Sequence, residues 1–385
     1  MTTVPLLGPT GLVSRVPLLE QPPVTRPTTP LRSRVAYAAA HVIPRVWGDN
    51  TPGAPADIDW EATLAFRHHL WSWGLGVAEA MDTAQRNMGL DWAATRELIR
   101  RTAKEAHSVG GSLVVGVNTD QLENEVVGLD EVVDAYLEQL EIAEDAGSAV
   151  VLMASRHLAR AATSAADYER VYHRVLDRAS QPVILHWLGP AFDHNLLGYF
   201  GSPAFDEASS AVIRIIEDNV ESVVGIKMSL LNADSEVALR ARLPRGVKLF
   251  TGDDFNYVDL IAGDGASYSD ALLGAFAAIG PLASAAIQEL DLDNVQGYRT
   301  LLEPTEPLSR QVFASPTQHY KTGIAFLSWL NGHQPAFSMI GGAHAARSLP
   351  HLSEIVRLAN EAHALEQPEL AAERWSSLLR LGGVS

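Results

Sequence analysis

The stretch "SVVGIKMSLL", residues 222–231, has the pattern of a buried β-strand that a single lysine interrupts. Apolar residues lie on both sides of Lys227, which is typical of a strand covered on both faces, as in parallel sheets. An ammonium group placed there loses hydration worth several kcal/mol unless it is paired or gives up its proton. Lys227 is therefore the first candidate for a residue with a chemical role.

Strand-like segments similar to this one recur along the chain and alternate with longer amphipathic segments. Residues 130–147 and 164–180, for example, carry apolar side chains at helical spacing and end in glycine or serine. Eight β–α units in succession favour a closed parallel barrel over an open sheet. The expected strands are residues 34–41, 74–80, 112–118, 148–154, 182–188, 223–229, 247–252 and, with a weaker pattern, 265–272.

The predicted fold class is α/β, a (β/α)8 TIM barrel over residues 33–280. The strand pattern ends near residue 280, so residues 281–385 are expected to form a C-terminal helical appendage. Seven prolines within residues 1–32 exclude a regular helix or a central strand there. We expect an extended N-terminal arm that lies along the barrel or reaches a neighbouring subunit.

The composition is that of a soluble globular protein. Of the 385 residues, 47% are apolar and 19% are charged, which is enough apolar material for a large core. The formal charge of -17 disfavours nucleic acid and anionic membrane partners, and the lack of cysteine excludes thiolate chemistry. No long apolar run or signal-peptide pattern is present, so we expect a cytoplasmic protein that acts on small molecules.

In a TIM barrel the functional face is formed by the C-terminal ends of the strands and the loops after them. Polar residues at these ends come from all eight expected strands and should share one crevice. They are His41, Glu79, Asp82, Asn118, Asp120, Arg156, His157, His186, Lys227, Ser229, Thr251, Asp253, Asp254, Ser267 and Ser269, with Trp187 beside them.

Three segments together resemble one enzyme family. They are "PVILHWLGP" (182–190), "VVGIKMSLLNAD" (223–234) and "VKLFTGDDFNYVDLIAGDGASYSDALLGAFAAIGP" (247–281). Their succession is similar to that in the dihydrodipicolinate synthase and N-acetylneuraminate lyase family of class I aldolases. The likeness extends roughly over residues 33–365, and it implies a TIM barrel with a three-helix appendage and a dimer or tetramer.

The resemblance implies that Lys227 forms a Schiff base with a substrate ketone and needs no cofactor. A desolvated lysine independently fits this role, because its lowered pKa leaves some neutral, nucleophilic amine near pH 7. The iminium would then stabilise a carbanion while a neighbouring bond breaks or forms. The alternative is a structural lysine that reaches the surface or pairs with a carboxylate such as Asp253.

The chain departs from the family at two positions. His186 stands where the family has a proton-relaying tyrosine; it is either a proton carrier or a hydrogen-bonded structural residue. Asp82 and Thr83 stand where the family binds the carboxylate of a 2-oxo acid. A carboxylate there repels an anionic substrate unless a cation or proton intervenes.

These departures favour a neutral, hydroxyl-rich carbonyl substrate such as a keto sugar, with a 2-oxo acid as the family alternative. The substrate-binding side chains would accept hydrogen bonds from hydroxyl groups or, for the tryptophan, stack on a sugar face. Each acid has a simpler interpretation as a helix cap or loop residue, and the tryptophan as a core residue. The candidates are Asp82, Thr83, Asn118, Asp120, Trp187, Asp253 and Ser267.

A second hypothesis is a metal-dependent sugar isomerase or hydrolase in which Lys227 stabilises charge. Carboxylates and histidines from several strand ends would hold a divalent cation. The ligands would come from Glu79, Asp120, His157, His186 and Asp253. A third, a non-catalytic sugar-binding barrel, does not account for a buried amine. His68 and His69, in the expected first helix, are interpreted as structural.

Overall fold

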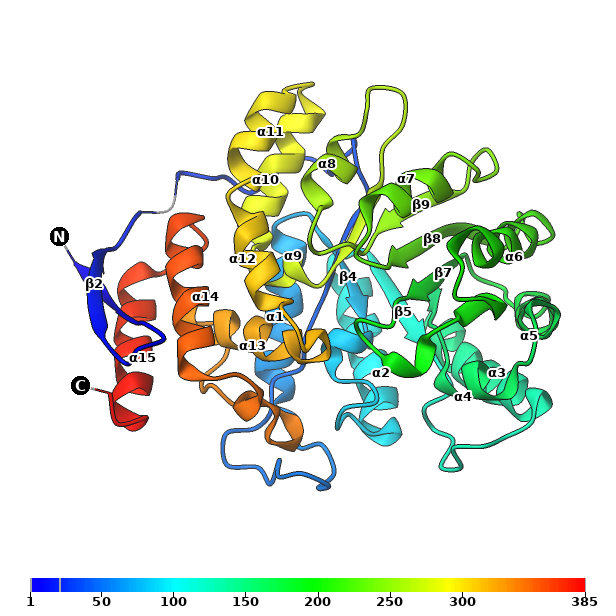
Figure 1. The fold of residues 1–385 in the computed structure, drawn as a ribbon, viewed down its shortest axis with the longest axis horizontal. Coiled ribbons are helices and arrows are strands. Elements are labelled where there is room, and N and C mark those ends of the chain that lie inside the picture. Colours follow the sequence, from blue (N-terminus) through cyan, green and yellow to red (C-terminus); the bar gives the residue numbers. More distant parts are fainter. Residues whose placement is uncertain (1, 21, 385) are drawn as a thin grey trace.

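The computed structural model describes residues 2–20 and 22–384 of the chain. Eight parallel strands form a closed barrel in the order β10-β3-β4-β5-β6-β7-β8-β9, with helices around it (Figure 1). This confirms the predicted TIM barrel. The barrel strands are β3 (Ala36–Ala39), β4 (Gly76–Glu79), β5 (Leu113–Val117), β6 (Ala149–Leu152), β7 (Val183–Leu188), β8 (Val223–Ser229), β9 (Lys248–Thr251) and β10 (Asp270–Leu273).

Seven of these strands lie within their predicted ranges, and the eighth begins later than expected. Residues 265–272 were expected to form it, but β10 starts at Asp270. The preceding residues form a turn in which Asp264 accepts hydrogen bonds from the backbone N–H groups of Ala266 and Ser267. Gly263 and Gly265 adopt positive φ angles of 77° and 86°, which a strand does not allow. Turn chemistry therefore outweighs the weak strand pattern here.

Local sequence signals begin the helices of the barrel. Asp59, Asp91 and Ser155 each accept a hydrogen bond from a backbone N–H group in the first turn of the helix that follows. The three capped helices are α1, α2 and α4. The helices up to residue 291 are α1 (Trp60–Ser72), α2 (Trp92–Val109), α3 (Leu129–Asp145), α4 (Arg156–Ala161), α5 (Ala165–Leu176), α6 (Phe205–Glu217), α7 (Ala233–Arg240), α8 (Tyr257–Ala262), α9 (Ala275–Ala278) and α10 (Gly280–Asp291).

Helices continue after the barrel, as the sequence predicts. They are α11 (Val295–Leu302), α12 (Thr305–Val312), α13 (Tyr320–Leu330), α14 (Leu349–Glu361) and α15 (Pro368–Leu381). Short 3-10 turns lie in the connections: η1 (Asp82–Ala84), η2 (His194–Leu196), η3 (Tyr199–Gly201), η4 (Thr317–His319) and η5 (Ile340–Ala346). Among the helices of the described residues, none is both long enough and apolar enough to cross a membrane.

The N-terminal segment is not simply extended: it forms an antiparallel hairpin of β1 (Thr3–Leu7) and β2 (Val13–Pro17). Each strand of this two-stranded sheet has one unpaired edge, and a proline there removes no hydrogen bond between the strands. The hairpin lies beside α14 and α15 at the far end of the molecule from the barrel (Figure 1). The backbone N–H of Leu7 donates to Ser353 Oγ at 2.7 Å, and Trp375 Nε1 donates to the Pro5 carbonyl at 2.7 Å. The hairpin thus packs on the appendage of its own chain.

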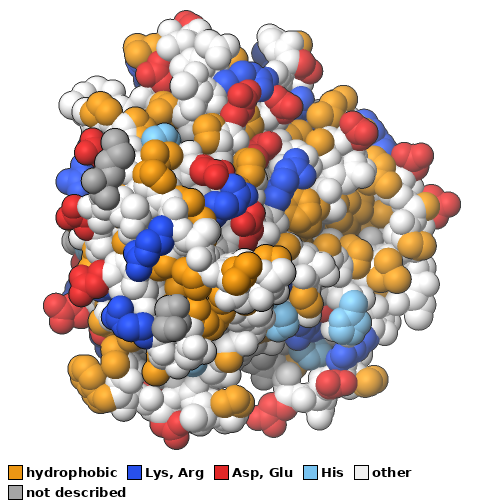
Figure 2. Space-filling model, turned by 60° about the vertical axis from the view of Figure 1, so that its left-hand side comes forward, with side chains coloured by type: hydrophobic (Ala, Val, Ile, Leu, Met, Phe, Trp, Pro, Cys, Tyr) orange, Lys and Arg blue, Asp and Glu red, His pale blue; other side chains and the backbone are white. Residues whose placement is uncertain are grey.

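The barrel lumen is filled by one apolar layer to which seven of the strands contribute. Its side chains exclude water from the lumen below the C-terminal ends of the strands. The layer contains Ala39, Ala78, Val114, Val151, Ile184, Phe250 and Leu272, with Met81 and Met153 at its edge. On the outside, acidic and basic side chains are interspersed over the face shown in Figure 2 rather than gathered into one basic patch.

Glu236 on α7 is a buried carboxyl group behind the barrel wall. It accepts hydrogen bonds from Thr251 Oγ1 at 3.0 Å and Ser269 Oγ at 2.7 Å. Burial raises its pKa to about 8, although these two hydrogen bonds oppose the shift. Between the ordinary pKa and pH 8 the folded protein keeps a proton that the unfolded chain releases, so stability falls as the pH rises through this window.

Glu236→Gln removes this titration. The parent protein loses stability as the pH is raised from 5.5 to 8, and the variant does not. The free energy of unfolding of the variant minus that of the parent should therefore increase by an amount on the order of a few kcal/mol over this range. Urea unfolding at both pH values measures the change. Glu217→Gln, on the exposed face of α6, is the control and should leave the pH dependence as it is. Equal pH dependence in both variants would contradict a protonated Glu236.

Candidate functional site

Lys227 and His186 form the centre of the site at the C-terminal end of the lumen. They are directly paired in the register of β7 and β8, so their side chains point to the same face of the sheet. That face is the lumen, because Ile184, two residues before His186, belongs to the apolar lumen layer. His186 is fully buried and Lys227 is 8% exposed. The lysine therefore points into the barrel and not among the surrounding helices.

A glycine directly after the next strand, β9, makes room for the lysine. A Cβ atom at Gly252 would lie 2.7 Å from Lys227 Cε and 2.1 Å from Ser229 Oγ. A Cβ atom at Gly225, on β8 itself, would likewise lie 2.7 Å from Cε2 of the Phe250 ring. The sequence places glycines where the strands must approach these side chains closely.

The amine of Lys227 is desolvated without being locked in an ion pair. Burial lowers its pKa, while the negative charges of Asp82 and Asp254 oppose the shift. Within residues 2–20 and 22–384, Lys227 makes no hydrogen bond or ion pair. The charges of both carboxylates therefore act on the amine without a direct hydrogen bond or ion pair among the described residues.

Asp254 was one of many polar residues at predicted strand ends, and nothing in the sequence favoured it as a catalytic or substrate-binding residue. Burial raises its pKa above the usual range, while a hydrogen bond from the backbone N–H of Ala275 at 2.8 Å and the charge of Lys227 oppose the shift. Its own carbonyl accepts from Ser309 Oγ on α12. A carboxyl group whose pKa is raised beside an amine whose pKa is lowered is suited to exchanging protons.

His186 is a neutral imidazole. Burial and the positive charge of Lys227 lower its pKa well below the usual value. Its Nε2 lies 3.3 Å from Ser229 Oγ, and its Nδ1 has no partner among the described residues. The position next to Lys227 agrees with the sequence expectation, but an imidazole that stays neutral does not gain and lose a proton near pH 7.

The rim above the amine is completed by the start of α13. Thr83 Oγ1 and the Tyr320 hydroxyl share a hydrogen bond of 2.9 Å, which joins the loop after β4 to the appendage. The neighbouring Lys321 is buried: its Nζ donates to the Gln318 carbonyl at 3.2 Å and lies 4.5 Å from the centre of the Tyr320 ring. Burial lowers the pKa of Lys321 to about 8, with Asp82 opposing the shift.

Lys321 was missed by the sequence reasoning. It lies in an apolar helical segment of the appendage, so the same signal that exposed Lys227, a lysine within an apolar run, was available. What the sequence does not contain is the position of α13 over the barrel mouth. Arg156, which pairs with Asp193, adds another positive charge close enough to lower the pKa of Lys321 further.

Two predicted substrate contacts are used by the protein itself. Asn118 Oδ1 accepts from the backbone N–H of Thr119 at 2.8 Å. Asp120 forms a two-point ion pair with Arg86, with Nε to Oδ2 at 2.6 Å, and the charge and hydrogen bonds of Arg86 hold its pKa low against the effect of burial. These contacts hold both side chains within the loop after β5.

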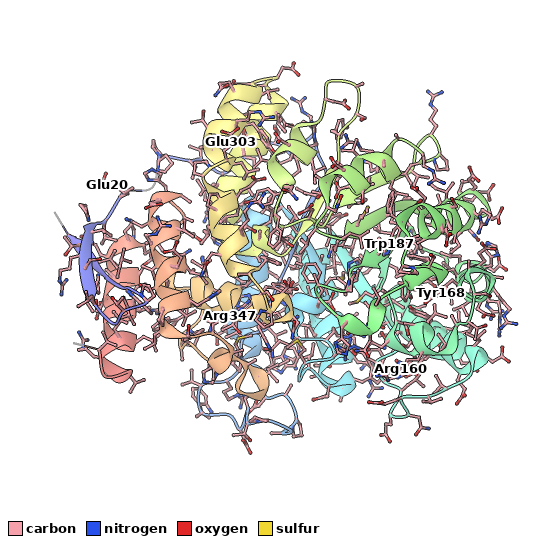
Figure 3. The ribbon with its side chains drawn as sticks, in the orientation of Figure 1. Glu20, Arg160, Tyr168, Trp187, Glu303 and Arg347 are labelled. Atoms are coloured by element: carbon pink, nitrogen blue, oxygen red, sulfur yellow. The ribbon has the colours of Figure 1, made fainter. Side chains whose placement is uncertain are left out.

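Trp187 is not a sugar platform. Side chains alternate along β7, so with His186 in the lumen Trp187 points outward. It stacks on Phe205 of α6 at 5.8 Å between ring centres and meets Phe200 edge-on at 5.4 Å. Figure 3 labels Trp187 in the part of the molecule that contains the barrel. It is a core residue between the barrel wall and its helices.

Asp253 and Ser267 are also placed differently from the prediction. The Asp253 carboxylate accepts from the backbone N–H groups of Phe255 and Asn256 and so organises the turn before α8. Ser267 lies in the exposed turn before β10, which is the opposite end of the barrel from the strand termini that form the site. Its hydroxyl bonds to Asp264.

The five predicted metal ligands are not brought together. Glu79 is paired with Arg67, Asp120 with Arg86, and His157 Nδ1 lies 2.9 Å from Thr119 Oγ1. Within residues 2–20 and 22–384, the one group of at least three side chains with metal-ligand spacing is His69, His333 and Glu366. None of these three is among the five predicted ligands.

Comparison with solved structures places the fold among known enzymes. The dihydrodipicolinate synthase of Thermotoga maritima is 14% identical with a TM-score of 0.65, and the alignment covers 86% of this chain and 99% of that one. The Bacillus anthracis dihydrodipicolinate synthase is 14% identical with a TM-score of 0.63, over 85% and 98%. The 4-hydroxy-tetrahydrodipicolinate synthase of Methylacidiphilum fumariolicum SolV is 17% identical with a TM-score of 0.64, over 88% and 99%.

These likenesses confirm that the chain shares the fold predicted from its resemblance to dihydrodipicolinate synthases. No curated protein matches it in sequence. A sequence family does match, over residues 6–384, which is nearly the whole length. The chain therefore belongs to the family described as "Protein of unknown function (DUF993)".

Proposed function

We propose that this protein is a lyase of the class I aldolase type, in which Lys227 forms a Schiff base with the ketone of a small substrate. The substrate is a keto sugar or a 2-oxo acid, and the reaction makes or breaks a C–C bond or removes water. The observation that carries the proposal is the amine of Lys227, which lies in the lumen, desolvated and without a hydrogen-bond or ion-pair partner among the described residues. A purely structural lysine has no use for such a position.

The chemistry follows from the neutral fraction of that amine. Its lone pair attacks the carbonyl carbon, the carbonyl oxygen leaves as water, and a protonated imine remains. The iminium withdraws electrons from the adjacent carbon, so a bond to that carbon breaks with its electron pair moving toward nitrogen. The resulting enamine takes up a proton at carbon and becomes an iminium again, and addition of water to that iminium releases the product ketone and the free amine of Lys227.

Protons must move at each of these steps, and Asp254 is better suited to move them than His186. Its raised pKa allows it to hold or release a proton near neutral pH, whereas the imidazole stays neutral. We therefore assign to Asp254, in the loop after β9, the proton-carrying role that the sequence suggested for His186. His186 instead supplies a dry, uncharged wall beside Lys227.

Lys321 changes the argument about substrate charge. Asp82 alone would repel an anionic substrate, but Lys321 places a cation near it, and with a pKa of about 8 the amine is mostly charged at pH 7. A 2-oxo acid is then as acceptable as a neutral keto sugar. The hydroxyl groups of Thr83 and Tyr320 offer hydrogen bonds to either.

Borohydride trapping tests the proposal directly. The purified protein is incubated with single members of a panel of 2-oxo acids and neutral keto sugars, reduced with borohydride, digested and analysed by peptide mass mapping. We expect one adduct, with the mass of the reduced imine, on the peptide that contains Lys227. The member that gives the adduct defines the substrate class.

Lys321 provides an internal control because it is a second buried lysine with a lowered pKa. Modification of Lys227 alone supports the proposal. An adduct confined to Lys321, or equal modification of both lysines and the surface Lys248, would refute it.

A further inference from the structure

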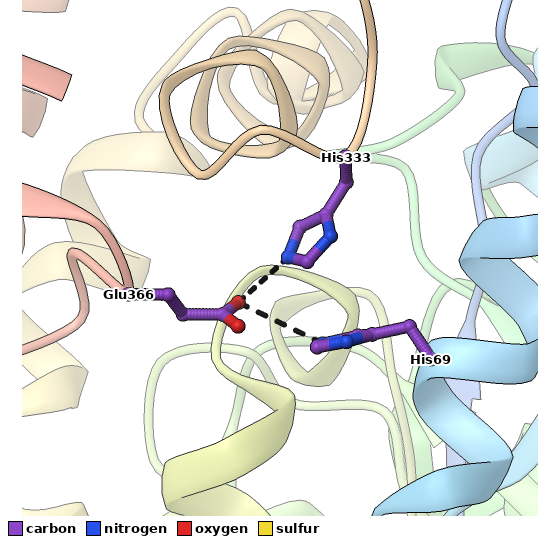
Figure 4. A group of neighbouring side chains, drawn as sticks. All are labelled: His69, His333 and Glu366. Atoms are coloured by element: carbon purple, nitrogen blue, oxygen red, sulfur yellow. Dashed lines mark hydrogen bonds and ion pairs between the residues drawn. The ribbon is translucent and has the colours of Figure 1, made fainter. Parts of the chain in front are cut away.

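Three side chains with metal-ligating atoms meet at the junction between the barrel and the appendage, away from Lys227. His69 comes from α1, His333 from the loop after α13, and Glu366 from the segment before α15 (Figure 4). The Nε2 atom of His333 lies 2.8 Å from Glu366 Oε1, and that of His69 lies 3.7 Å from the same oxygen. The two imidazole rings are 4.1 Å apart between centres.

The spacing of these atoms fits a first-row divalent cation. One ligand atom from each residue lies within 4.8 Å of the other two. A tetrahedral zinc ion holds nitrogen and oxygen ligands at about 2.0–2.1 Å, which places the ligand atoms roughly 3.3 Å from one another. Side-chain adjustments below about 1.5 Å, without movement of the helices, would bring the three atoms to that spacing.

The surroundings hold the imidazoles and leave access for an ion. The ring of Phe66 is stacked with His69 at 6.1 Å and lies 5.5 Å from His333, so both rings are packed against one aromatic side chain. The side chains of His69, His333 and Glu366 are 15%, 17% and 18% exposed, which admits an ion and a water from solvent.

We propose that His69, His333 and Glu366 form a binding site for a zinc-type divalent transition-metal ion, with water in the fourth position. Two imidazoles and one carboxylate select this class over magnesium or calcium, which take oxygen ligands. The ion would join α1 of the barrel to the connections on both sides of α14, so its effect is on the stability of that junction. The site is independent of the chemistry at Lys227.

The chain offers a matched control on the same helix. His68, the neighbour of His69, contacts Glu105 at 2.9 Å, and this pair belongs to no group of three possible ligands in the described part of the chain. Metal-stripped protein is titrated with zinc and, separately, with magnesium, in the parent and in the variants His68→Gln, His69→Gln and His333→Gln. Bound metal is counted after gel filtration, and thermal midpoints are measured with and without zinc.

We expect one equivalent of zinc and a raised thermal midpoint in the parent and in His68→Gln, with no response to magnesium. His69→Gln and His333→Gln should bind zinc at least about 100-fold more weakly and lose the thermal shift. If either variant fails to fold, Glu366→Gln replaces it in the comparison. A parent protein without a saturable zinc equivalent, or variants that bind as the parent does, would overturn the assignment. Borohydride trapping at Lys227 should proceed equally with and without chelator.

Discussion

Replacing Lys227 by methionine is expected to abolish borohydride trapping and to lower kcat/KM by about 10³-fold or more for the carbonyl compound that traps. Methionine fills similar volume in the lumen but has no amine, so the imine cannot form. Lys227→Arg tests charge separately, because the guanidinium stays protonated and cannot act as a nucleophile. Both variants should show the same loss if the covalent step is essential.

Lys321→Arg is the companion variant. It keeps the positive charge at the rim beside Asp82, so trapping at Lys227 should persist, with any effect confined mainly to substrate binding. Peptide mapping and steady-state kinetics on the three variants distinguish the roles. Activity that survives in Lys227→Arg would show that the lysine acts through its charge alone, as the metal-enzyme hypothesis requires.

Breaking the buried ion pair of Arg67 and Glu79 should produce the largest loss of stability. Both side chains are fully buried, and Arg67 Nε and Nη2 lie 2.8 and 2.9 Å from the two carboxylate oxygens. In Arg67→Met, the donors that remain to the Glu79 carboxylate from residues 2–20 and 22–384 are neutral: the hydroxyl of Thr102 and the backbone N–H of Ala80. We expect the free energy of unfolding to fall by about 3–5 kcal/mol.

The double variant Arg67→Met with Glu79→Met should recover most of that loss, because no unpaired charge remains. Arg101→Met is the surface control: Arg101 and Glu97 are 43% and 40% exposed, and the change should cost less than about 1 kcal/mol. Urea unfolding of the four proteins gives the comparison. A cost for Arg67→Met no larger than that for Arg101→Met would contradict the expectation.

The barrel was predictable because its strands are buried on both faces and so appear as short apolar runs between amphipathic segments. Lys227 was predictable for the same reason, since it is the polar exception within such a run. The outward direction of Trp187 was also available from the sequence, because adjacent residues of a strand point to opposite faces. Once His186 is assigned to the lumen, its neighbour cannot be there.

Other parts of the site depend on tertiary placement. Asp253 and Asp254 are consecutive, and only the path of the turn after β9 decides which of them faces the amine. Lys321 reaches the rim because α13 packs across it, which local sequence does not encode. The junction of His69, His333 and Glu366 joins segments nearly 300 residues apart, so the pattern around His69 alone suggested a structural residue.

The hairpin of β1 and β2 sets an order on how the molecule is completed during synthesis. Its buried side chains Val4, Leu6 and Leu7 pack with helices whose residues follow more than 340 positions later, as the Leu7 bond to Ser353 shows. On the ribosome these apolar groups have no docking surface until α14 and α15 emerge. Segments more than 340 residues apart in the chain therefore pack together in a slow, long-range step of folding.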